Sequence, residues 1–341
     1  MSEKYCIFCG KKPENKNLEH VIPQWLIRMT GRQNKNIYAP HPDLNADIPF
    51  MRFTFPACTK CNTRFSKMEA AVKPVLERVL AGQSISGADA SLLMDWFDKV
   101  RIGMWLSNMY YDPELKQKTR PHFFIADRVA KSDRMLSIRK INFKDNEKNG
   151  IYCTGTMTNL FKCCPSAFTM VINDYYFFNA SNNNLISPRV GFPGLCKPTL
   201  VDEEKGMFCA DFIKGTHKVA NPIIQTFVPD SESINFYQPI YKDYLKSSLF
   251  PMDDYILEHS YDSELGLGGV FVQRGIVGKA KYTAKDEKVS TKLKAGAKPN
   301  LSADVLKFQN AVQEKNPLSC VDSDLGVELN KIVIDAIKRQ R

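Results

Sequence analysis

Residues 6–9 read Cys-Ile-Phe-Cys, and residues 58–61 repeat the same spacing as Cys-Thr-Lys-Cys. A Cys-x-x-Cys pair is typical of a tight turn that presents two thiolates, and two such pairs separated by a long gap can close on one tetrahedral Zn²⁺. Four protein ligands leave no open position, so a zinc site of this kind is structural. The sequence therefore predicts one structural zinc held by Cys6, Cys9, Cys58 and Cys61.

A second group of polar residues stands beside the cysteine pairs. Residues 19–23 read Glu-His-Val-Ile-Pro, and Asn62 directly follows the second pair. Carboxylate and amide oxygens are ligands for Mg²⁺ or Mn²⁺, and a neutral histidine can take a proton from water near pH 7. If the zinc brings these groups together, they form a second metal site suited to phosphodiester hydrolysis.

Three segments, CIFCG, LEHVIP and CTKCNTRF, carry a family resemblance. Together they resemble the HNH, or ββα-metal, nuclease family, and are most similar to its four-cysteine zinc branch, which includes the endonuclease VII type of junction resolvase. The resemblance covers about residues 4–80. It implies that Glu19 and Asn62 bind a catalytic Mg²⁺ or Mn²⁺, that His20 is the general base, and that the DNA product carries a 5′ phosphate.

Two positions depart from the family pattern. Glu19 stands where the family more often has Asp or His, and Ser66 stands where it often has a metal-binding His. The third ligand of the divalent ion is therefore unassigned, with Ser66 and Glu69 as weak candidates.

Two alternative functions are compatible with the same residues. The first is a restriction-type endonuclease, in which residues 83–341 read DNA sequence or base modification. The second is a non-catalytic zinc ribbon that binds DNA or another protein, because zinc alone implies no catalysis and ribbons are mostly binding modules. The combination of Glu19, His20 and Asn62 favours a nuclease over an inert ribbon.

The charge of the chain fits a polyanionic partner. Its formal net charge is +10, and Lys and Arg side chains that contact phosphates release counterions from DNA. A basic protein can also use its charge for solubility alone, so the charge supports DNA binding without establishing it. Candidate phosphate contacts flank the predicted site at Arg28, Arg32, Arg52, Lys60 and Arg64.

Length and composition set the domain organisation and the compartment. With 341 residues, two domains are expected, and we predict an HNH module over 1–82 and a larger α+β domain over 83–341. The sequence has neither a long apolar run nor an apolar leader, so we expect a soluble, cytoplasmic protein with no membrane contact. In that compartment no disulfide framework is expected, and the six cysteines outside the two pairs are interpreted as buried or incidental thiols.

The expected elements give an α+β fold class. For the N-terminal module we predict strands at 17–22 and 51–55 and a helix at 62–80, which is a ββα unit. Small polar residues at 81–89 predict a domain boundary. Beyond it we expect a buried helix at 91–111, then strands at 122–125, 136–143, 167–172, 175–178 and 268–272, and helices at 302–314 and 325–338.

The larger domain shows no nucleotide-binding fingerprint and no second catalytic set. A nuclease module this small reads little DNA sequence, so we expect the rest of the chain to gate, target or assemble it. The architecture is similar to HNH effectors of bacterial anti-phage systems. Candidate partners besides DNA are a regulatory protein, a small-molecule activator or a second copy of the chain. Residues 279–298 hold seven lysines and two acids, which predicts a solvated loop or, less often, a nucleic-acid-binding arm.

Overall fold

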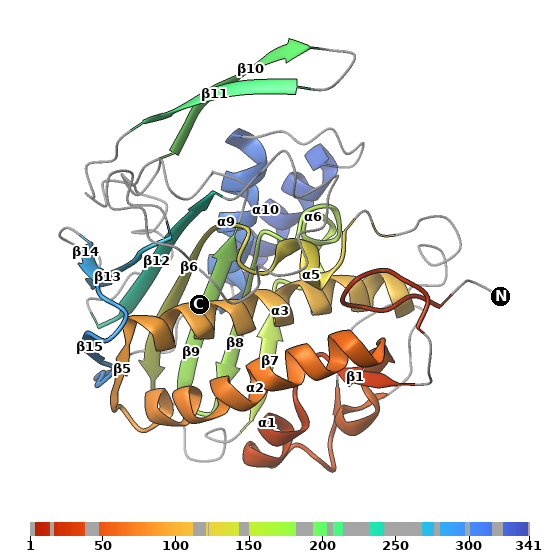
Figure 1. Ribbon diagram of the computed structural model, residues 1–341, viewed down its shortest axis with the longest axis vertical. Coiled ribbons are helices and arrows are strands. Elements are labelled where there is room, and N and C mark those ends of the chain that lie inside the picture. Colours follow the sequence, from red (N-terminus) through yellow and green to blue (C-terminus); the bar gives the residue numbers. More distant parts are fainter. Residues whose placement is uncertain are drawn as a thin grey trace.

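The structure is a computed structural model, and it confirms a mixed α+β architecture (Figure 1). It describes residues 4–13, 17–37, 48–111, 121, 123–142, 150–181, 194–202, 207–213, 232–241, 268–275, 280–296, 301–315 and 323–339. No helix in this part of the chain combines the length and apolar character that crossing a membrane requires.

The N-terminal part forms two strands followed by a helix, in the predicted order. Strand β1 (Leu18–His20) pairs antiparallel with β4 (Thr54–Pro56), so that Glu19 lies opposite Phe55. Helix α2 (Thr59–Leu80) follows directly. The connection from β1 to β4 contains α1 (Gln24–Met29), β2 (Asn36–Ile37) and β3 (Ile48–Pro49).

The second strand begins later than its sequence predicts. Phe50–Arg52 forms a 3₁₀ turn, and extended structure begins only at Thr54. Phe50 and Phe53 are both buried, and a spacing of three places them on the same side of a 3₁₀ turn. Burial of these two rings therefore replaces the first part of the expected strand.

The expected linker at 81–89 is regular structure instead. Gly82 turns the chain with a φ of +67°. Ser84–Ser86 then forms β5, and α3 (Gly87–Tyr111) starts immediately after it. Strand β5 pairs with β15 (Lys288–Ser290), which lies inside the lysine-rich segment. One hydrophobic cluster runs across the predicted boundary, because Val79, Ile85 and Trp96 belong to the same buried group. The division at residue 82 stays a prediction.

The larger part of the chain is built on one mostly antiparallel sheet of eight strands, whose order is β14-β13-β12-β6-β9-β8-β7, with β16 pairing parallel to β6. The bounds are β6 (Ser132–Ile141), β7 (Ile151–Thr154), β8 (Ala167–Ile172), β9 (Tyr175–Ser181), β12 (Ile234–Tyr241), β13 (Val270–Arg274), β14 (Lys281–Thr283) and β16 (Ala295–Gly296). The predicted β8–β9 hairpin is confirmed, and Asn173 in its turn has a φ of 54°.

The strand expected at 122–125 is absent from the described part of that segment. Ile125–Arg128 is instead the short helix α5. The Phe124 backbone N–H donates to Asp127 Oδ2 at 2.8 Å, so an acid in the first turn caps this helix. His122 lies outside the described residues.

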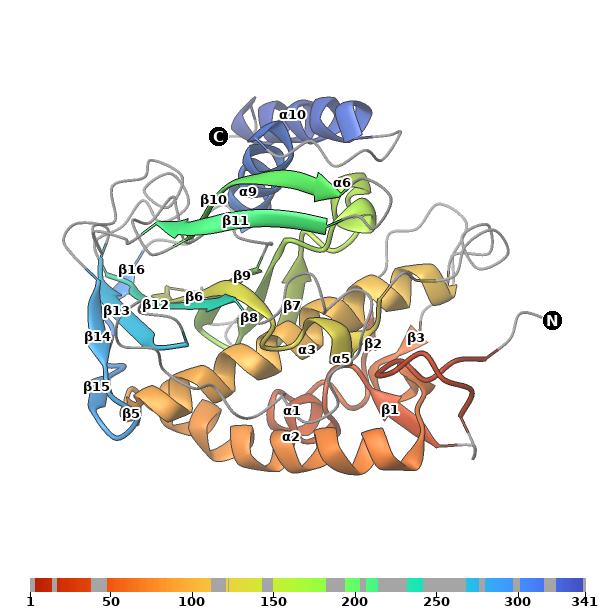
Figure 2. The same ribbon diagram turned by 45° about the horizontal axis from the view of Figure 1, so that its top comes forward.

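Helices cover both faces of the sheet (Figures 1 and 2). Alternation along β9 sends Phe177 toward α3, where its ring lies 5.1 Å from Phe97. It sends Phe178 to the opposite face, where its ring lies 5.4 Å from Phe308 of α9 (Leu301–Lys315). Helix α10 (Ser323–Arg339) packs beside α9. A short helix α6 (Asn159–Cys163) and a hairpin of β10 (Gly194–Asp202) and β11 (Met207–Ile213) complete the described elements.

The two terminal helices differ in how they use their apolar faces. In α9, Val305, Phe308 and Val312 lie on one face of the helix, and all three are buried. In α10 the large apolar side chains of Leu325, Leu329, Ile332 and Val333 are 41–63% exposed, whereas Val327, Asn330 and Ile334 are buried.

Candidate metal centre and active site

The four predicted zinc ligands come together at the start of α2. The Sγ atoms of Cys6, Cys9, Cys58 and Cys61 all lie within 4.8 Å of one another, and Cys9 Sγ is 3.9 Å from Cys58 Sγ. Zinc–sulfur bonds of about 2.3 Å in a tetrahedron would place sulfurs about 3.8 Å apart. The group could therefore bind a metal ion, and its geometry is compatible with structural zinc.

The backbone forms both cysteine turns. The Gly10 N–H donates to the Cys6 carbonyl at 2.9 Å, and Gly10 has a φ of +71°. A Cβ at this position would lie 2.1 Å from the Phe124 ring, so only glycine fits the turn. The Cys58 N–H donates to Cys6 Sγ at 3.3 Å, which fastens the first turn to the second.

Hydrogen bonds between the thiols shift the pKa values of Cys6 and Cys9 in opposite directions. Hydrogen bonds from the thiols of Cys61 and Cys9 lower the pKa of Cys6 to about 2. The shared hydrogen bond with Cys6 raises the pKa of Cys9 to about 11. A bound divalent cation would supply the positive charge that keeps all four sulfurs as thiolates.

Glu19 is buried against a lysine that the sequence analysis did not identify. Lys99 Nζ donates to Glu19 Oε1 at 2.6 Å, to Glu69 Oε1 at 2.5 Å and to the His20 carbonyl oxygen at 3.1 Å. The Lys99 side chain is 0% exposed. An ammonium has three N–H donors, and here each of them has a partner.

The electrostatics of this cluster follow from its burial. Burial alone would lower the pKa of Lys99, but the charges of Glu69 and Glu19 outweigh it and raise the pKa. Burial raises the pKa of Glu69, against the opposing charge of Lys99. The ammonium is therefore firmly held in its charged form between the two carboxylates.

His20 lies at the end of β1 with its ring half buried. The His20 Nε2 atom is 3.2 Å from the Met51 carbonyl oxygen, and the Gln24 side-chain nitrogen is 3.4 Å from His20 Nε2. When Nε2–H donates to Met51, the ring is neutral at Nδ1, which keeps its lone pair. The carbonyl of Met51 is thus the ring partner that a histidine base requires.

Asn62 is in the first turn of α2, half buried beside the cysteines. Glu69 is seven residues further along the same helix, so the two lie on one face about 10 Å apart along the axis. Exposed Ser66 lies between them. Lys99 therefore links Glu19 to Glu69, because it is paired with both carboxylates. That Glu19 and Asn62 share a metal ion stays a prediction.

The fit of a divalent ion rests on oxygens that Lys99 leaves free. Among the described residues, the four cysteines are the one group of three or more His, Cys, Asp or Glu side chains that could hold a metal. Lys99 uses one oxygen of Glu19 and one of Glu69. The second oxygen of each carboxylate is a ligand of the kind that Mg²⁺ or Mn²⁺ prefers. The ammonium of Lys99 is also positively charged, so it opposes a cation bound nearby.

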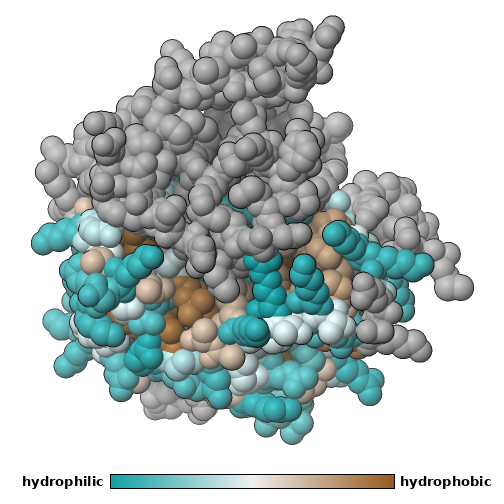
Figure 3. All heavy atoms as spheres, viewed as in Figure 1, coloured by the Kyte–Doolittle hydropathy of each residue, from teal (hydrophilic) through white to brown (hydrophobic). Residues whose placement is uncertain are grey.

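The predicted phosphate contacts differ in their surroundings. Lys60 and Arg52 are exposed and Arg64 is half buried. Arg32 instead donates to the Tyr152 hydroxyl at 2.8 Å and lies over its ring. The described surface on the side drawn in Figure 3 is mostly hydrophilic, with smaller hydrophobic areas.

No family model, curated protein or solved structure matches this chain. The functional assignment therefore rests on the side chains of the site.

Proposed function

We propose that the N-terminal part of the chain is an HNH-type, metal-dependent endonuclease module that hydrolyses phosphodiester bonds of DNA. The observation that carries the proposal is the setting of His20. It lies on the first strand of a ββα unit beside the four-cysteine group, and its Nε2 is 3.2 Å from the Met51 carbonyl oxygen. In the tautomer that donates from Nε2 to this carbonyl, Nδ1 is the acceptor. A histidine oriented in this way is suited to be a general base.

The chemistry divides among few residues. His20 Nδ1 takes the proton of the attacking water. Glu19 and Asn62 would hold Mg²⁺ or Mn²⁺ through oxygen atoms, with Glu69 as a third candidate. When bound, such an ion polarises the scissile phosphate and stabilises the leaving oxygen. Zinc on the four cysteines would hold β1 and α2 together, and the product would carry a 5′ phosphate.

DNA would be held by the basic surface around this module. Lys60, Arg52 and Arg64 lie near the site and would contact backbone phosphates, which position a duplex without reading its sequence. Three short stretches of the lysine-rich segment are paired as β14, β15 and β16, so the loop prediction is wrong for those residues. Exposed lysines remain there, at Lys281, Lys285, Lys288, Lys292 and Lys294.

In this proposal the sheet and its flanking helices regulate or target the nuclease. Helix α3 packs against both α2 and the sheet, so it is one of the elements through which the larger part of the chain meets the module. A role as an anti-phage defence effector, with an activating protein or small molecule, fits this arrangement. A restriction-type enzyme would use the same contact for targeting.

One observation favours a second candidate, a non-catalytic zinc module that binds DNA or protein. Glu19 is ion-paired with Lys99, and a carboxylate that already has a cation partner can serve the fold alone.

A digestion experiment separates the two candidates. Supercoiled and linear DNA are incubated with the full-length protein in EDTA, Mg²⁺ or Mn²⁺, and the product ends are analysed. The nuclease proposal predicts cleavage only with the divalent ion and products with 5′ phosphates. DNA binding without cleavage under all these conditions would favour the zinc-binding module.

A further inference from the structure

Lys99 joins the three elements that form the proposed site. Its partners Glu19 and His20 are on β1, Glu69 is on α2, and Lys99 itself comes from α3. The hydrogen bond to the His20 carbonyl and the ion pair with Glu19 act on two consecutive residues of β1. A single ammonium thus fixes both the backbone of the proposed base and the side chain of the proposed metal ligand.

Helix α3 packs closely against the residues that follow His20, and this packing positions Lys99. Gly103 is one turn beyond Lys99 on the same face, and a Cβ there would lie 2.8 Å from Val21 Cγ1. Lys99 Nζ also lies 6.0 Å from the centre of the Phe8 ring, which stacks on Phe65 at 4.1 Å. Contacts with the first cysteine turn and with the residues after His20 therefore set the position of the ammonium.

Lys99 is too deeply buried to meet a substrate itself. Its side chain is 0% exposed, whereas the side chains of Glu19 and Glu69 are 9% and 14% exposed. The carboxylates thus have solvent contact, and the ammonium lies behind them. Stability alone does not require a lysine here, because apolar replacements of buried ion pairs are often neutral or stabilising.

We propose that Lys99 is a positioning residue of the nuclease site, which holds one oxygen of Glu19 and the His20 carbonyl so that the other Glu19 oxygen is aimed at a divalent ion. The inference rests on the proposed function and adds a residue from outside the segment that resembles the HNH family. Partners that hydrogen-bond a ligating carboxylate are typically worth about 10- to 100-fold in metal affinity or activity.

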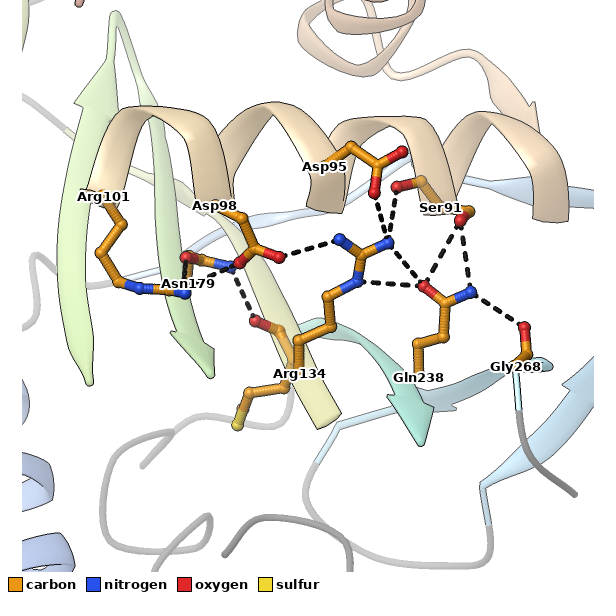
Figure 4. A network of polar contacts seen from close by, with 9 residues as sticks. Ser91, Asp95, Asp98, Arg101, Arg134, Asn179, Gln238 and Gly268 are labelled. Atoms are coloured by element: carbon orange, nitrogen blue, oxygen red, sulfur yellow. Dashed lines mark hydrogen bonds and ion pairs between the residues drawn. The ribbon is translucent and has the colours of Figure 1, made fainter. Parts of the chain in front are cut away.

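A matched control lies on the same helix. Arg134 of β6 forms ion pairs with Asp95 at 2.7 Å and with Asp98 at 2.8 Å, and it also donates to Gln238 (Figure 4). This network is as buried as Lys99, but it joins α3 to the sheet. Asp98→Asn therefore removes a charge from a buried α3 network without touching β1.

The test variant keeps the charge of the cluster. Two carboxylates and one ammonium give the wild-type cluster a net charge of minus one, and the double variant Lys99→Met/Glu69→Gln has one carboxylate and the same net charge. Glu69→Gln alone retains Lys99 with Glu19 and His20. A comparison of the single and double variants isolates the ammonium, and it avoids leaving two buried carboxylates unpaired.

The experiment uses the full-length protein of each variant at equal zinc content and well below its unfolding midpoint. Three quantities are measured: binding of Mn²⁺ alone by electron paramagnetic resonance, DNA affinity in EDTA, and cleavage rate at saturating DNA with Mg²⁺. Lys99→Met/Glu69→Gln is expected to bind Mn²⁺ and cleave DNA about 10-fold or more worse than Glu69→Gln, with equal DNA affinity. Asp98→Asn is expected to lower the unfolding midpoint only.

The outcomes distinguish a failure of the positioning role of Lys99 from a failure of the proposed nuclease function. A wild-type protein that binds Mn²⁺ and cleaves DNA, with no further loss when Met replaces Lys99 in the Glu69→Gln background, overturns the positioning role alone. The same holds if Asp98→Asn slows cleavage as much as the loss of Lys99. A wild-type protein that neither binds Mn²⁺ nor cleaves DNA overturns the proposed function, and the inference with it.

Discussion

Glu19 and His20 are neighbours in the chain, but their side chains leave β1 on opposite sides. Glu19 is buried against Lys99, and His20 lies half exposed against the Met51 carbonyl. Alternation along a strand gives each residue its own environment. A carboxylate and an imidazole can thus have separate tasks although they are adjacent in sequence.

The first prediction at the residue scale concerns the cysteine group. Cys58→Ser should remove one of four ligands and release the bound metal, and because metal binding is coupled to folding, the N-terminal module should lose structure. Metal content by mass spectrometry and circular dichroism measure both effects. Cys164→Ser is the control, since Cys164 is a cysteine that lies outside the four-cysteine group. A stable Cys58→Ser protein with a full complement of zinc would contradict the assignment.

A second residue-scale prediction concerns pH and the start of α3. The Ser86 N–H donates to Asp89 Oδ2 at 2.8 Å, the Asp89 N–H donates to Ser86 Oγ at 3.1 Å, and Arg78 pairs with the same carboxylate. Burial opposes ionisation, but these hydrogen bonds and the charge of Arg78 together hold the pKa of Asp89 below its usual 3.8. A carboxyl group with a lowered folded pKa stabilises the fold above its unfolded pKa, and this contribution is lost as the pH falls through the folded value.

Asp89→Asn should therefore lower the free energy of unfolding by about 1 kcal/mol at pH 7, the usual size of a capping effect. The difference from wild type should shrink as the pH falls below 3.8. Urea unfolding of both proteins across this range gives the comparison. A difference that persists unchanged in acid would show that the charge of Asp89 is not its source.

Sequence spacing predicts contacts only where the pattern itself defines them. Two Cys-x-x-Cys pairs have one geometric solution around a metal, so the convergence of Cys6, Cys9, Cys58 and Cys61 follows from the sequence. The pairing of Lys99 with Glu19 spans 80 residues and depends on how α3 packs. A signal existed in the buried helix expected at 91–111, because Asp95, Asp98, Lys99 and Arg101 could be buried there only with partners.

At the scale of elements, α3 is the helix on which the site and the sheet both depend. Its own side chains Trp96, Phe97 and Trp105 are buried, and its charged side chains extend in two directions. Lys99 reaches β1 and α2, while Asp98 reaches Arg134 on β6. Displacement of α3 would change both networks together.

Gly103→Ala tests how closely α3 must pack against the residues after His20. Alanine favours a helix by about 1 kcal/mol over glycine, but its Cβ would lie 2.8 Å from Val21 Cγ1, and valine is stiff at χ1. We expect a net loss of about 1–3 kcal/mol in the free energy of unfolding, as for other overpacked cores. Denaturant unfolding measures it.

The companion variant is Val21→Ala, which removes the methyl groups that a Cβ at position 103 would clash with. In that background Gly103→Ala should cost much less, so a double-mutant cycle should show favourable coupling. Additive effects of the two substitutions would mean that the contact does not limit the approach of α3.

Elements whose apolar residues recur at a clear helix or strand spacing were predictable from the sequence. Elements that depend on tertiary contacts were not. The helix at 91–111 and the hairpin at 167–178 follow from apolar runs and an Asn-Asp turn. The short helix α5 depends on the cap from Asp127. The 3₁₀ turn at Phe50–Arg52 depends on the core that its two flanking rings enter.

At the scale of the whole molecule, the fold is a sheet with a helix layer on each face, and the N-terminal part with the four cysteines lies against one of those layers (Figure 2). The α+β class follows from the mixture of periods along the chain. The strand order does not, because β12 lies between β13 and β6 across long stretches of chain. Such pairings depend on tertiary packing, which local sequence patterns do not define.

The most direct test of the account is the cleavage rate of the full-length protein with His20→Ala. Both proteins are compared at equal zinc content on the same DNA, with saturating Mg²⁺. Loss of a general base is expected to lower the rate by about 100-fold or more, while DNA affinity and the unfolding midpoint stay unchanged. A His20→Ala protein that cleaves DNA as fast as the wild type would contradict the assignment of His20 as the base.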